Sequence, residues 1–297
     1  MIPYFLCIGA QKSGTTTLHH FLKSSSEIEL PFTSKEAPFF SENDRYTQGW
    51  EKYFQENFIS NTKKKYGKVS PQYMYHESIP YRIKKLFPDI KIIAILRDPI
   101  DRAISQYRMN LARGYETRSI NKAFEEELIP EKLIKARALL PQRYDKGLET
   151  NCYLVRGEYG RLLKPYFANF DKSQILVLFF DDLKERPKYI LESISKFLNV
   201  SSFNEEINIH FHSTKSSKYD LIFNKLNKIA QKSGFNNLIP QNINDNYRRF
   251  RAKLRTEQNE VNISNDNLQK LIDLYSRDYY LMKIIGLYDV TWEWIRK

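Results

Sequence analysis

Three short apolar runs, each followed by a polar turn and then by helical spacing, most constrain how this chain can fold. The runs lie at 3–8, 90–96 and 175–180, and the second is rich in isoleucine. Uninterrupted apolar runs of this length are typical of strands buried on both faces. Strands that alternate with helices are typical of a mainly parallel sheet. The sequence therefore predicts an α/β fold with a central, mainly parallel sheet flanked by helices.

Helical spacing accompanies these runs and recurs along the rest of the chain. It predicts helices at 15–23, 79–87, about 101–113, 121–140, 154–169, 188–198, 217–231 and 265–282. Between about 233 and 264 the sequence is rich in asparagine and carries several arginines, so we expect an irregular basic excursion there. Strand patterns occur on both sides of residue 150 without forming two independent sets. We therefore expect one domain over residues 1–297.

The charge and cysteine content bound the partners and the compartment. The 297 residues include 47 Lys plus Arg and 35 Asp plus Glu, a formal net charge of +12. This excess fits either a solvated lysine-rich surface or an anionic partner such as phosphate, sulfate, nucleic acid or an acidic glycan. Two cysteines, Cys7 and Cys152, are too few for a disulfide framework or a zinc cluster. With no stretch near the ~18 apolar residues of a membrane span and no signal-peptide pattern, we expect a cytoplasmic protein without membrane contact.

The sequence GAQKSGTTT, at 9–17, joins the first predicted strand to the first predicted helix. Backbone N–H groups of such a loop converge, and the helix N-terminus adds partial positive charge, so the loop is a candidate anion site. Lys12 would add a full charge, and Thr15 and Thr16 would add hydroxyl donors. An ordinary glycine turn with a helix cap is the alternative. The loop is not a Walker A loop, because Thr15 follows Gly14 where that motif has lysine, and this disfavours an NTPase.

A second candidate anion-binding segment follows the run at 90–96. Arg97 offers a fork of donors suited to bidentate phosphate contact. Ser105, eight residues later, is expected inside the next helix with its hydroxyl near the same anion. Asp98 and Pro99 are expected to shape the turn and cap that helix. Arg102 could be a third contact, although a surface arginine at a helix start is commoner.

The two motifs, in this order and each after a predicted strand, resemble those of sulfotransferases that use 3′-phosphoadenosine 5′-phosphosulfate (PAPS). The first resembles the 5′-phosphosulfate loop G-x-x-K-[SA]-G-T-[TS], and the second resembles R-[DN]-P-x-x-R-x-x-S, which binds the 3′-phosphate. The resemblance implies a P-loop-like three-layer fold, PAPS as co-substrate, no metal, and release of 3′-phosphoadenosine 5′-phosphate (PAP). It implies donor contacts from Gln11, Lys12, Ser13, Gly14, Thr15, Thr16, Arg97 and Ser105.

Further segments resemble the heparan sulfate (3-O/N) branch of this family, in a bacterial-type cytosolic member. SKEAPFF, at 34–40, resembles K-E-x-x-F-F, whose glutamate is the catalytic base. The resemblance therefore implies Lys12 and Glu36 as catalytic residues. Independently of the resemblance, His19 and His20, just inside the first predicted helix, and His76 are other candidates for the base. A segment at 212–218 resembles a loop that closes over the nucleotide, which adds Lys215, Ser216, Ser217 and Lys218. Candidate acceptor contacts are Lys35, Tyr73, His76 and His20.

Two departures weaken the inference to a heparan-like acceptor. Lys68 stands where the family often has glutamate, and no cysteine lies beyond Cys152 to form the disulfide of the 3-O-sulfotransferases. We therefore expect sulfuryl transfer to a hydroxyl or to an amine or carbamoyl nitrogen of a small molecule, such as an alkaloid or other secondary metabolite. A saccharide acceptor is the alternative.

Two more distant alternatives concern the chain as a whole. One is a P-loop phosphotransferase, and the other is a basic nucleic-acid-binding protein whose contacts would come from the arginines between 248 and 255. The first needs a Walker A lysine position, which is absent. Mixtures of basic and aromatic residues arise easily by chance in a chain with 42 aromatic residues, so nucleic acid is not expected as a partner. We expect a monomer or a homodimer.

Overall fold

The computed structural model describes residues 2–34, 38–59, 64–112, 115–140, 152–201, 203, 262–288, 290 and 292–295. Within them, five strands form one sheet in the order β2–β3–β1–β4–β5. Every neighbouring pair is parallel, so the prediction of a mainly parallel sheet is confirmed. The strands are β1 (Phe5–Gly9), β2 (Ile28–Glu29), β3 (Lys65–Val69), β4 (Lys91–Leu96) and β5 (Ile175–Phe179).

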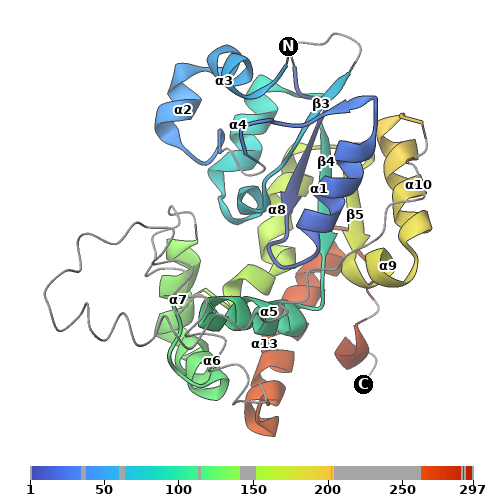
Figure 1. Ribbon diagram of the computed structural model, residues 1–297. Coiled ribbons are helices and arrows are strands. Elements are labelled where there is room, and N and C mark those ends of the chain that lie inside the picture. The colour runs from blue at the N-terminus through green and yellow to red at the C-terminus, as the bar shows by residue number, and fades with distance from the viewer. Residues whose placement is uncertain are drawn as a thin grey trace, which may run out of the picture.

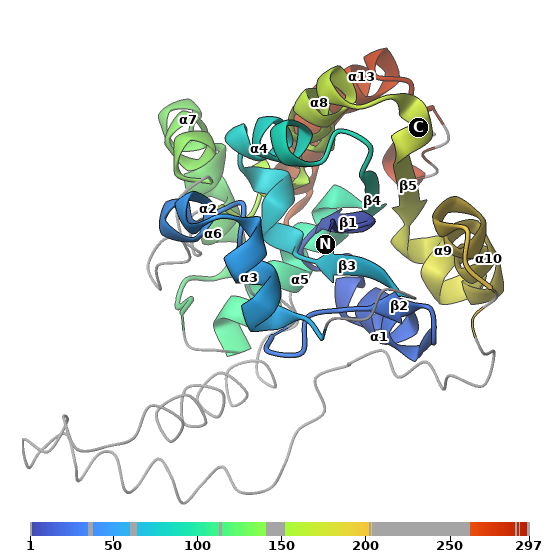
Figure 2. The same cartoon turned by 90° about the horizontal axis from the view of Figure 1, so that it is seen from above.

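Helices cover both faces of this sheet, which gives three layers (Figures 1 and 2). On one face lie α1 (Thr15–Ser24) and α10 (Pro187–Leu198), whose apolar side chains join one buried cluster with the sheet. On the other face lie α4 (Ser78–Leu86) and α8 (Tyr159–Asn169), in a second cluster. The predicted three-layer arrangement is therefore present.

The alternation of side chains along β1 explains its uninterrupted apolar sequence. Phe5 and Cys7 belong to the cluster under α1 and α10, whereas Leu6 and Ile8 belong to the cluster under α4 and α8. All four side chains are fully buried. Because successive side chains of a strand point to opposite faces, only an apolar run can fill both clusters at once.

A third group of helices lies beyond the carboxyl ends of the strands (Figure 1). It consists of α5 (Pro99–Ala112), α6 (Ile120–Leu128), α7 (Pro130–Leu139) and α13 (Asn265–Ile284). Buried side chains of α5, α6 and α13 share an apolar core of their own. This group forms a floor beneath the edge of the sheet at which α/β proteins bind their ligands.

The remaining elements of the described residues are short. They are α2 (Asn43–Gln48), α3 (Trp50–Asn57), α9 (Phe180–Glu185) and four 3₁₀ turns, η1 (Pro71–Tyr75), η3 (Val155–Gly157), η4 (Lys172–Gln174) and η5 (Glu293–Ile295). The sequence did not predict β2, β3, α2, α3 or α9.

Two expected helices have different bounds in the structure. The helix expected at 121–140 is divided into α6 and α7, because Pro130 lacks a backbone N–H and instead occupies the first position of α7. The helix expected from 154 begins as α8 at Tyr159, after the 3₁₀ turn η3. The helix expected at 217–231 lies outside the described residues, as does the basic excursion up to residue 261.

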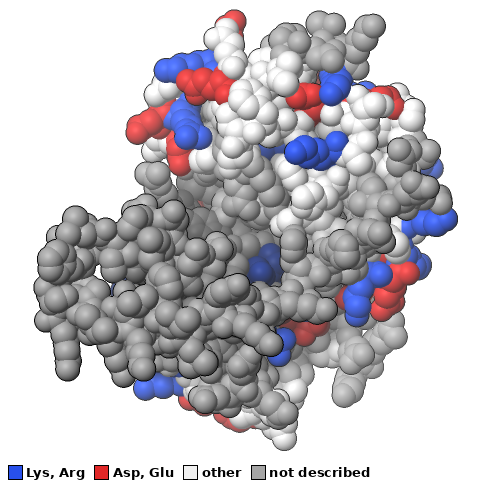
Figure 3. All heavy atoms as spheres, in the orientation of Figure 1, with Lys and Arg blue, Asp and Glu red and all other residues white. Residues whose placement is uncertain are grey.

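Basic side chains on the described surface are mixed with acidic ones. Figure 3 shows Lys and Arg interspersed with Asp and Glu on this face rather than gathered into one patch. Several form ion pairs, including Lys64 with Glu29 at 2.9 Å and Lys270 with Asp266 at 2.6 Å. This part of the surface gives the nucleic-acid alternative no support. None of the helices in the described ranges has the length and apolar character needed to cross a membrane.

Two buried carboxylates from the floor hold the chain on either side of η3. Glu127 of α6 accepts hydrogen bonds from the backbone N–H groups of Tyr153 (2.8 Å) and Leu154 (2.9 Å). Asp278 of α13 accepts from the N–H groups at the start of α8, those of Gly160 (2.7 Å) and Arg161 (2.9 Å). Burial raises the pKa of each carboxyl to about 7, although these hydrogen bonds favour the charged form.

Titration of Asp278 should make stability depend on pH. The folded chain keeps this proton up to about pH 7, whereas the unfolded chain releases it near the ordinary pKa of 3.8. Between these values the folded state binds more protons, so the free energy of unfolding falls as pH rises, by up to ~1.4 kcal/mol per pH unit. Asp278→Asn should flatten this slope by that amount between pH 5 and 6.5 in urea unfolding. Asp273→Asn, at an exposed position of the same helix, is the control, and an identical slope in all three proteins would contradict the prediction.

Candidate active site

The loop at 10–14 joins β1 to α1 at the carboxyl edge of the sheet. Because β1 lies between β3 and β4, the segments that follow all three strands meet there. The backbone N–H of Ala10 donates to the carbonyl of Ile95 in β4 at 2.7 Å. The backbone N–H of Gln11 donates to the hydroxyl of Tyr75, at the end of η1, at 2.8 Å. The loop is thus attached to both neighbouring strand ends.

The backbone of this loop has the shape of an anion site. Lys12 has φ of 71° and Gly14 has φ of 88°, both in the left-handed region. Such residues turn successive N–H groups toward one concave side. A Cβ on Gly14 would lie 2.9 Å from side-chain carbons of Phe180 and Leu183, so both the conformation and the space require glycine. α1 begins at Thr15 with no acidic residue in its first turn, which leaves its N-terminus favourable to an anion.

The loop side chains differ in how far they reach the surface. Thr16 is exposed, Gln11 and Lys12 are half-buried, and Ser13 and Thr15 are buried. The Lys12 ammonium lies 3.7 Å from the sulfur of Met109 on α5, a weak acceptor. The backbone N–H of Ser13 donates to the carbonyl of Ala10 at 3.3 Å, so Ser13 shapes the loop in this conformation.

Arg97 follows β4 directly, beside the loop. Its guanidinium lies over the ring of Phe180 at 4.7 Å, and one nitrogen is 3.3 Å from the carboxylate of Asp101. Asp101 is 59% exposed, so this pair contributes little. The Arg97 Nε is buried and has no hydrogen-bond partner in the described part of the chain. A buried donor without a partner is costly, and a bound anion would satisfy it. Ser105 is half-buried on α5, within the same strand–turn–helix unit.

The turn after Arg97 agrees with the prediction for two residues and corrects it for a third. Asp98 accepts from the N–H groups of Ile100 (2.9 Å) and Asp101 (3.0 Å), and Pro99 is the first residue of α5. Asp98 and Pro99 therefore cap the helix, as predicted. The expectation that Arg102 lies on the surface is wrong. It is fully buried, and it donates to the side chain of Gln106 and to the carbonyl of Tyr153.

The candidate acceptor residues are distributed over three elements. Tyr73 is fully buried, and its hydroxyl accepts from the backbone N–H of Phe39 at 3.1 Å, so here it supports the chain next to 35–37. His20 is exposed on α1, four residues after Thr16 and thus on the same helical face. His76 is half-buried. The candidates Lys35, Glu36 and 215–218 lie outside the described residues.

The environment of His76 disfavours it as a base. Its Nδ1 accepts from the backbone N–H of Ser78 at 3.3 Å and lies 2.9 Å from the hydroxyl of the same residue. These contacts favour the neutral tautomer with its proton on Nε2, in which the lone pair of Nδ1 is already engaged by Ser78. Burial, helped by the charge of Arg82, lowers the pKa of His76.

Several site residues were not predicted from the sequence. Tyr75 and Arg156 hold Gln11, Phe180 lies beneath Arg97, and the hydroxyl of Tyr159 donates to the Arg97 carbonyl at 2.9 Å. The sequence placed Arg156 and Tyr159 only within the helix expected at 154–169. Their contacts with Gln11 and Arg97 depend on tertiary packing, and no sequence pattern indicates them.

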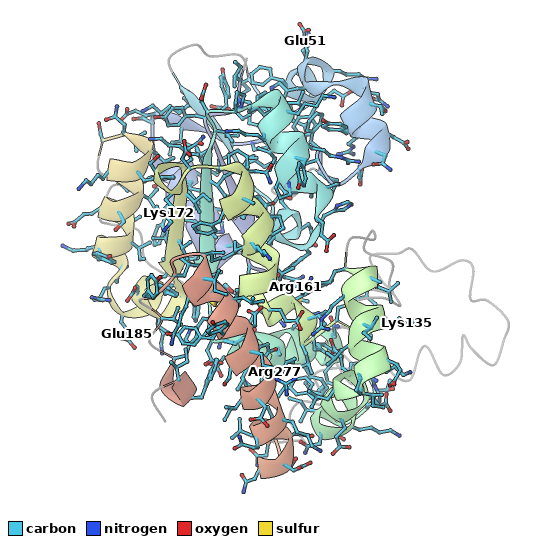
Figure 4. All side chains as sticks on the ribbon, turned by 180° about the vertical axis from the view of Figure 1, so that it is seen from behind. Glu51, Lys135, Arg161, Lys172, Glu185 and Arg277 are labelled. Carbon is cyan, nitrogen blue, oxygen red and sulfur yellow. The ribbon has the colours of Figure 1, made fainter. Side chains whose placement is uncertain are left out.

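One cavity among the described residues lies away from these strand ends. It has a volume of about 500 Å³ between α7, α8 and α13, and its lining includes Arg161 and Arg277. Figure 4 shows these two arginines on α8 and α13, seen from the side opposite to Figure 1. Its lining contains no residue of the loop at 10–14 or of the segment from Arg97 to Ser105. The convergence of strand ends, rather than the size of this cavity, identifies the candidate active site.

The parallel sheet, the left-handed loop before α1 and the arginine after the neighbouring strand β4 are typical of α/β proteins that bind phosphorylated ligands at the carboxyl edge of the sheet. Residues 3–273 match the family described as "Sulfotransferase domain". The chain therefore belongs to the sulfotransferase family, as its motifs predicted. Members of this family generally use PAPS as the sulfuryl donor.

Individual relatives agree with this assignment. The chain is 35% identical over 205 residues to the bifunctional heparan sulfate N-deacetylase/N-sulfotransferase 1 of Xenopus laevis. It is 32% identical over 210 residues to the bifunctional heparan sulfate N-deacetylase/N-sulfotransferase 2 of Homo sapiens. These alignments cover 67% and 68% of this chain, but the chain spans only 22% of the length of either relative.

A solved structure supports the fold. The crystal structure of a sulfotransferase from Alicyclobacillus acidocaldarius is similar with a TM-score of 0.57 and 23% sequence identity. The match covers 78% of this chain and 92% of that one. The expected P-loop-like three-layer fold is thereby confirmed.

Proposed function

We propose that this chain transfers the sulfuryl group of PAPS to a nucleophilic acceptor and releases PAP. The observation that carries the proposal is the placement of two anion-binding groups side by side. The loop at 10–14 and Arg97 follow β1 and β4, which are neighbours in the sheet. A nucleotide with charged groups at its 5′ and 3′ positions needs two such sites. The partnerless Nε of Arg97 and the left-handed backbone at Lys12 and Gly14 both fit this ligand.

The residues have separate roles in the proposed reaction. The loop N–H groups, Thr15 and Thr16 hold the 5′-phosphate, and Arg97 with Ser105 holds the 3′-phosphate. The acceptor attacks sulfur in line as the bond from sulfur to the 5′-phosphate oxygen breaks. Lys12 neutralises the charge that develops on this oxygen. PAPS has no β/γ-phosphate pair for Mg²⁺ to bridge, so the proposal includes no metal.

The acceptor proton needs a base, and we propose Glu36 for this role. The proposal rests on the resemblance of 34–40 to the family segment that carries the catalytic glutamate. The described residues that follow this segment are firmly held. Phe39 and Phe40 are fully buried, and the backbone N–H of Phe39 donates to the hydroxyl of Tyr73. Lys35 and the residues at 215–218 stay predicted contacts to the acceptor and the nucleotide, respectively.

For the acceptor, we propose a hydroxyl or a nitrogen of a small molecule, with an amino sugar of a saccharide as the second candidate. Two relatives are named as N-sulfotransferases of heparan sulfate, and this favours the second candidate, an amino sugar. Incubation with PAPS and mass spectrometry of the products tests both. One panel should contain phenols, alcohols and amines of low mass, and the other should contain oligosaccharides with free glucosamine nitrogens. A mass gain of one sulfuryl group in only one panel selects that acceptor class.

The donor assignment predicts a preference among nucleotides. The chain should bind PAP at least tenfold more tightly than AMP, because Arg97 and Ser105 contact only the 3′-phosphate. Arg97→Ala should remove most of this difference, a loss of about 1.5–3 kcal/mol for a charged hydrogen bond. Calorimetry with both nucleotides measures the effect.

A matched arginine provides the control for this experiment. Arg186 also pairs with a carboxylate four residues away, Asp182 at 2.5 Å, and lies over the ring of Tyr189 at 5.2 Å. Arg186→Ala should leave the preference for PAP intact. Equal affinity of the unmodified chain for PAP and AMP would overturn the donor assignment.

A further inference from the structure

Arg156 contacts the phosphate loop although 145 positions separate it from Gln11. It lies in η3, is 6% exposed, and donates from a terminal guanidinium nitrogen to the side-chain oxygen of Gln11 at 2.5 Å. Its guanidinium also lies over the ring of Tyr75, 5.2 Å from the centroid. The hydroxyl of that ring accepts from the Gln11 backbone N–H at 2.8 Å. Arg156 thus contacts the side chain of Gln11 and the tyrosine that holds its backbone.

Gln11 is placed where such support matters. It directly precedes Lys12, whose backbone is in the left-handed region with φ of 71°. A residue other than glycine adopts this conformation at a cost of roughly 1–2 kcal/mol, so surrounding contacts must hold it. The two hydrogen bonds to Gln11 are contacts of this kind, since they fix both its side chain and its backbone.

The segment that carries Arg156 is itself firmly held. Before it, Glu127 accepts from the N–H groups of Tyr153 and Leu154, and the hydroxyl of Tyr275 donates to the Leu154 carbonyl at 3.0 Å. After it, a Cβ on Gly157 would come within 2.8 Å of Pro99, so the backbone packs closely against the start of α5. The helices of the floor therefore fix the position of η3, and the hydrogen bond from Arg156 to Gln11 links η3 to the loop.

We propose that Arg156 is a positioning residue for the 5′-phosphosulfate loop, acting through Gln11 and Tyr75. The inference rests on the proposed function and adds a residue that the motifs do not contain. Without Arg156, Gln11 loses the donor to its side chain, and Tyr75 loses the cation over its ring. The loop then samples conformations in which its N–H groups no longer converge, so binding at the 5′ end of the nucleotide weakens. The 3′-phosphate site, built by Arg97 and Ser105 on another strand end, is unaffected.

Three nucleotides separate this role from a general structural one. PAP carries both phosphates, AMP carries only the 5′-phosphate, and adenosine 3′-phosphate carries only the other. Arg156→Met keeps the bulk of the side chain and removes its charge and donors. We expect this substitution to weaken the binding of PAP and of AMP about tenfold or more, the scale of one charge-assisted hydrogen bond. Binding of adenosine 3′-phosphate should change less than about twofold, within the scatter expected for a site the substitution does not reach.

A double-mutant cycle tests the route through Gln11. Gln11→Ala removes the same contact from the other side and leaves Arg156 in place, so it should show the same selective loss. The double variant should bind PAP no more weakly than the worse single variant, because residues that act through one contact are not additive. Arg156→Lys keeps a charged donor and should recover part of the affinity.

Arg137→Met is the control. Arg137 lies outside the site and pairs with Glu158 at 2.6 Å, so the variant should bind all three nucleotides as the unmodified chain does. Urea unfolding confirms that each variant folds, and Gln11→Ala carries the test if Arg156→Met does not. Unchanged PAP affinity, equal loss for all three nucleotides or additive effects in the cycle would overturn the role of Arg156. Failure of the unmodified chain to prefer PAP over AMP would instead overturn the proposed function.

Discussion

Lys12→Ala is expected to lower turnover by about two to three orders of magnitude, the effect typical of removing one group that stabilises developing charge. The affinity for PAP should fall much less. The 5′-phosphate of the product keeps the backbone donors of the loop and the start of α1, whereas the charge that appears during transfer loses its counter-ion. Turnover at saturating PAPS and calorimetry with PAP measure the two effects separately.

The structure makes Lys12 a suitable position for this test. Its side chain belongs to the loop at 10–14, and its ammonium contacts the thioether of Met109 at 3.7 Å. Lys12→Met keeps the aliphatic stem, and Lys23→Ala removes an exposed lysine from the last turn of α1, the helix that follows the loop, as a control. If Lys12→Ala abolishes PAP binding but leaves turnover at saturating donor unchanged, Lys12 anchors the nucleotide and does not stabilise the leaving group.

Strands could be predicted from the sequence where apolar residues fill both faces of the sheet. A strand that carries charged residues or glycine was not predicted. β1, β4 and β5 were located from their apolar runs. β3 was not, because Lys65, Gly67 and Lys68 look unlike a buried strand. In the structure the ammonium of Lys68 is buried and donates to the hydroxyl of Tyr53 at 2.6 Å. Gly67 is required because a Cβ would lie 2.0 Å from the ring of Phe5.

The candidate site divides in the same way. The loop at 10–14 and Arg97 belong to local motifs, and local sequence was enough to place them at strand ends. The residues that hold them are distant in sequence, since 145 positions separate Gln11 from Arg156, and 62 separate Arg97 from Tyr159. Arg102 illustrates the same limit. Its burial follows from the floor helices that pack over α5, and nothing in the sequence near residue 102 indicates that packing.

Glu36→Gln should preserve folding and PAP binding while lowering the rate by roughly 10²–10⁴, the range for loss of a general base. The substitution keeps the shape of the side chain and removes its proton affinity. Glu42→Gln is a matched control, because Glu42 is a nearby glutamate in an ion pair with Arg45 at 3.2 Å. Single-turnover rates with saturating PAPS, and calorimetry with PAP, report the rate and the binding separately.

The histidine variants decide where the base is if Glu36→Gln has little effect. His76→Asn should stay near the unmodified rate, because Ser78 already engages the Nδ1 lone pair of His76 in the tautomer that its contacts favour. His20→Asn, on an exposed face of α1, should also be near normal. Collapse of one histidine variant beside a normal Glu36→Gln would move the base to that histidine. Normal rates in all three would point to a neutral amine acceptor, which can attack sulfur first and lose its proton afterwards. An alcohol cannot do so easily, so the Glu36→Gln defect should be larger with alcohol acceptors than with amines.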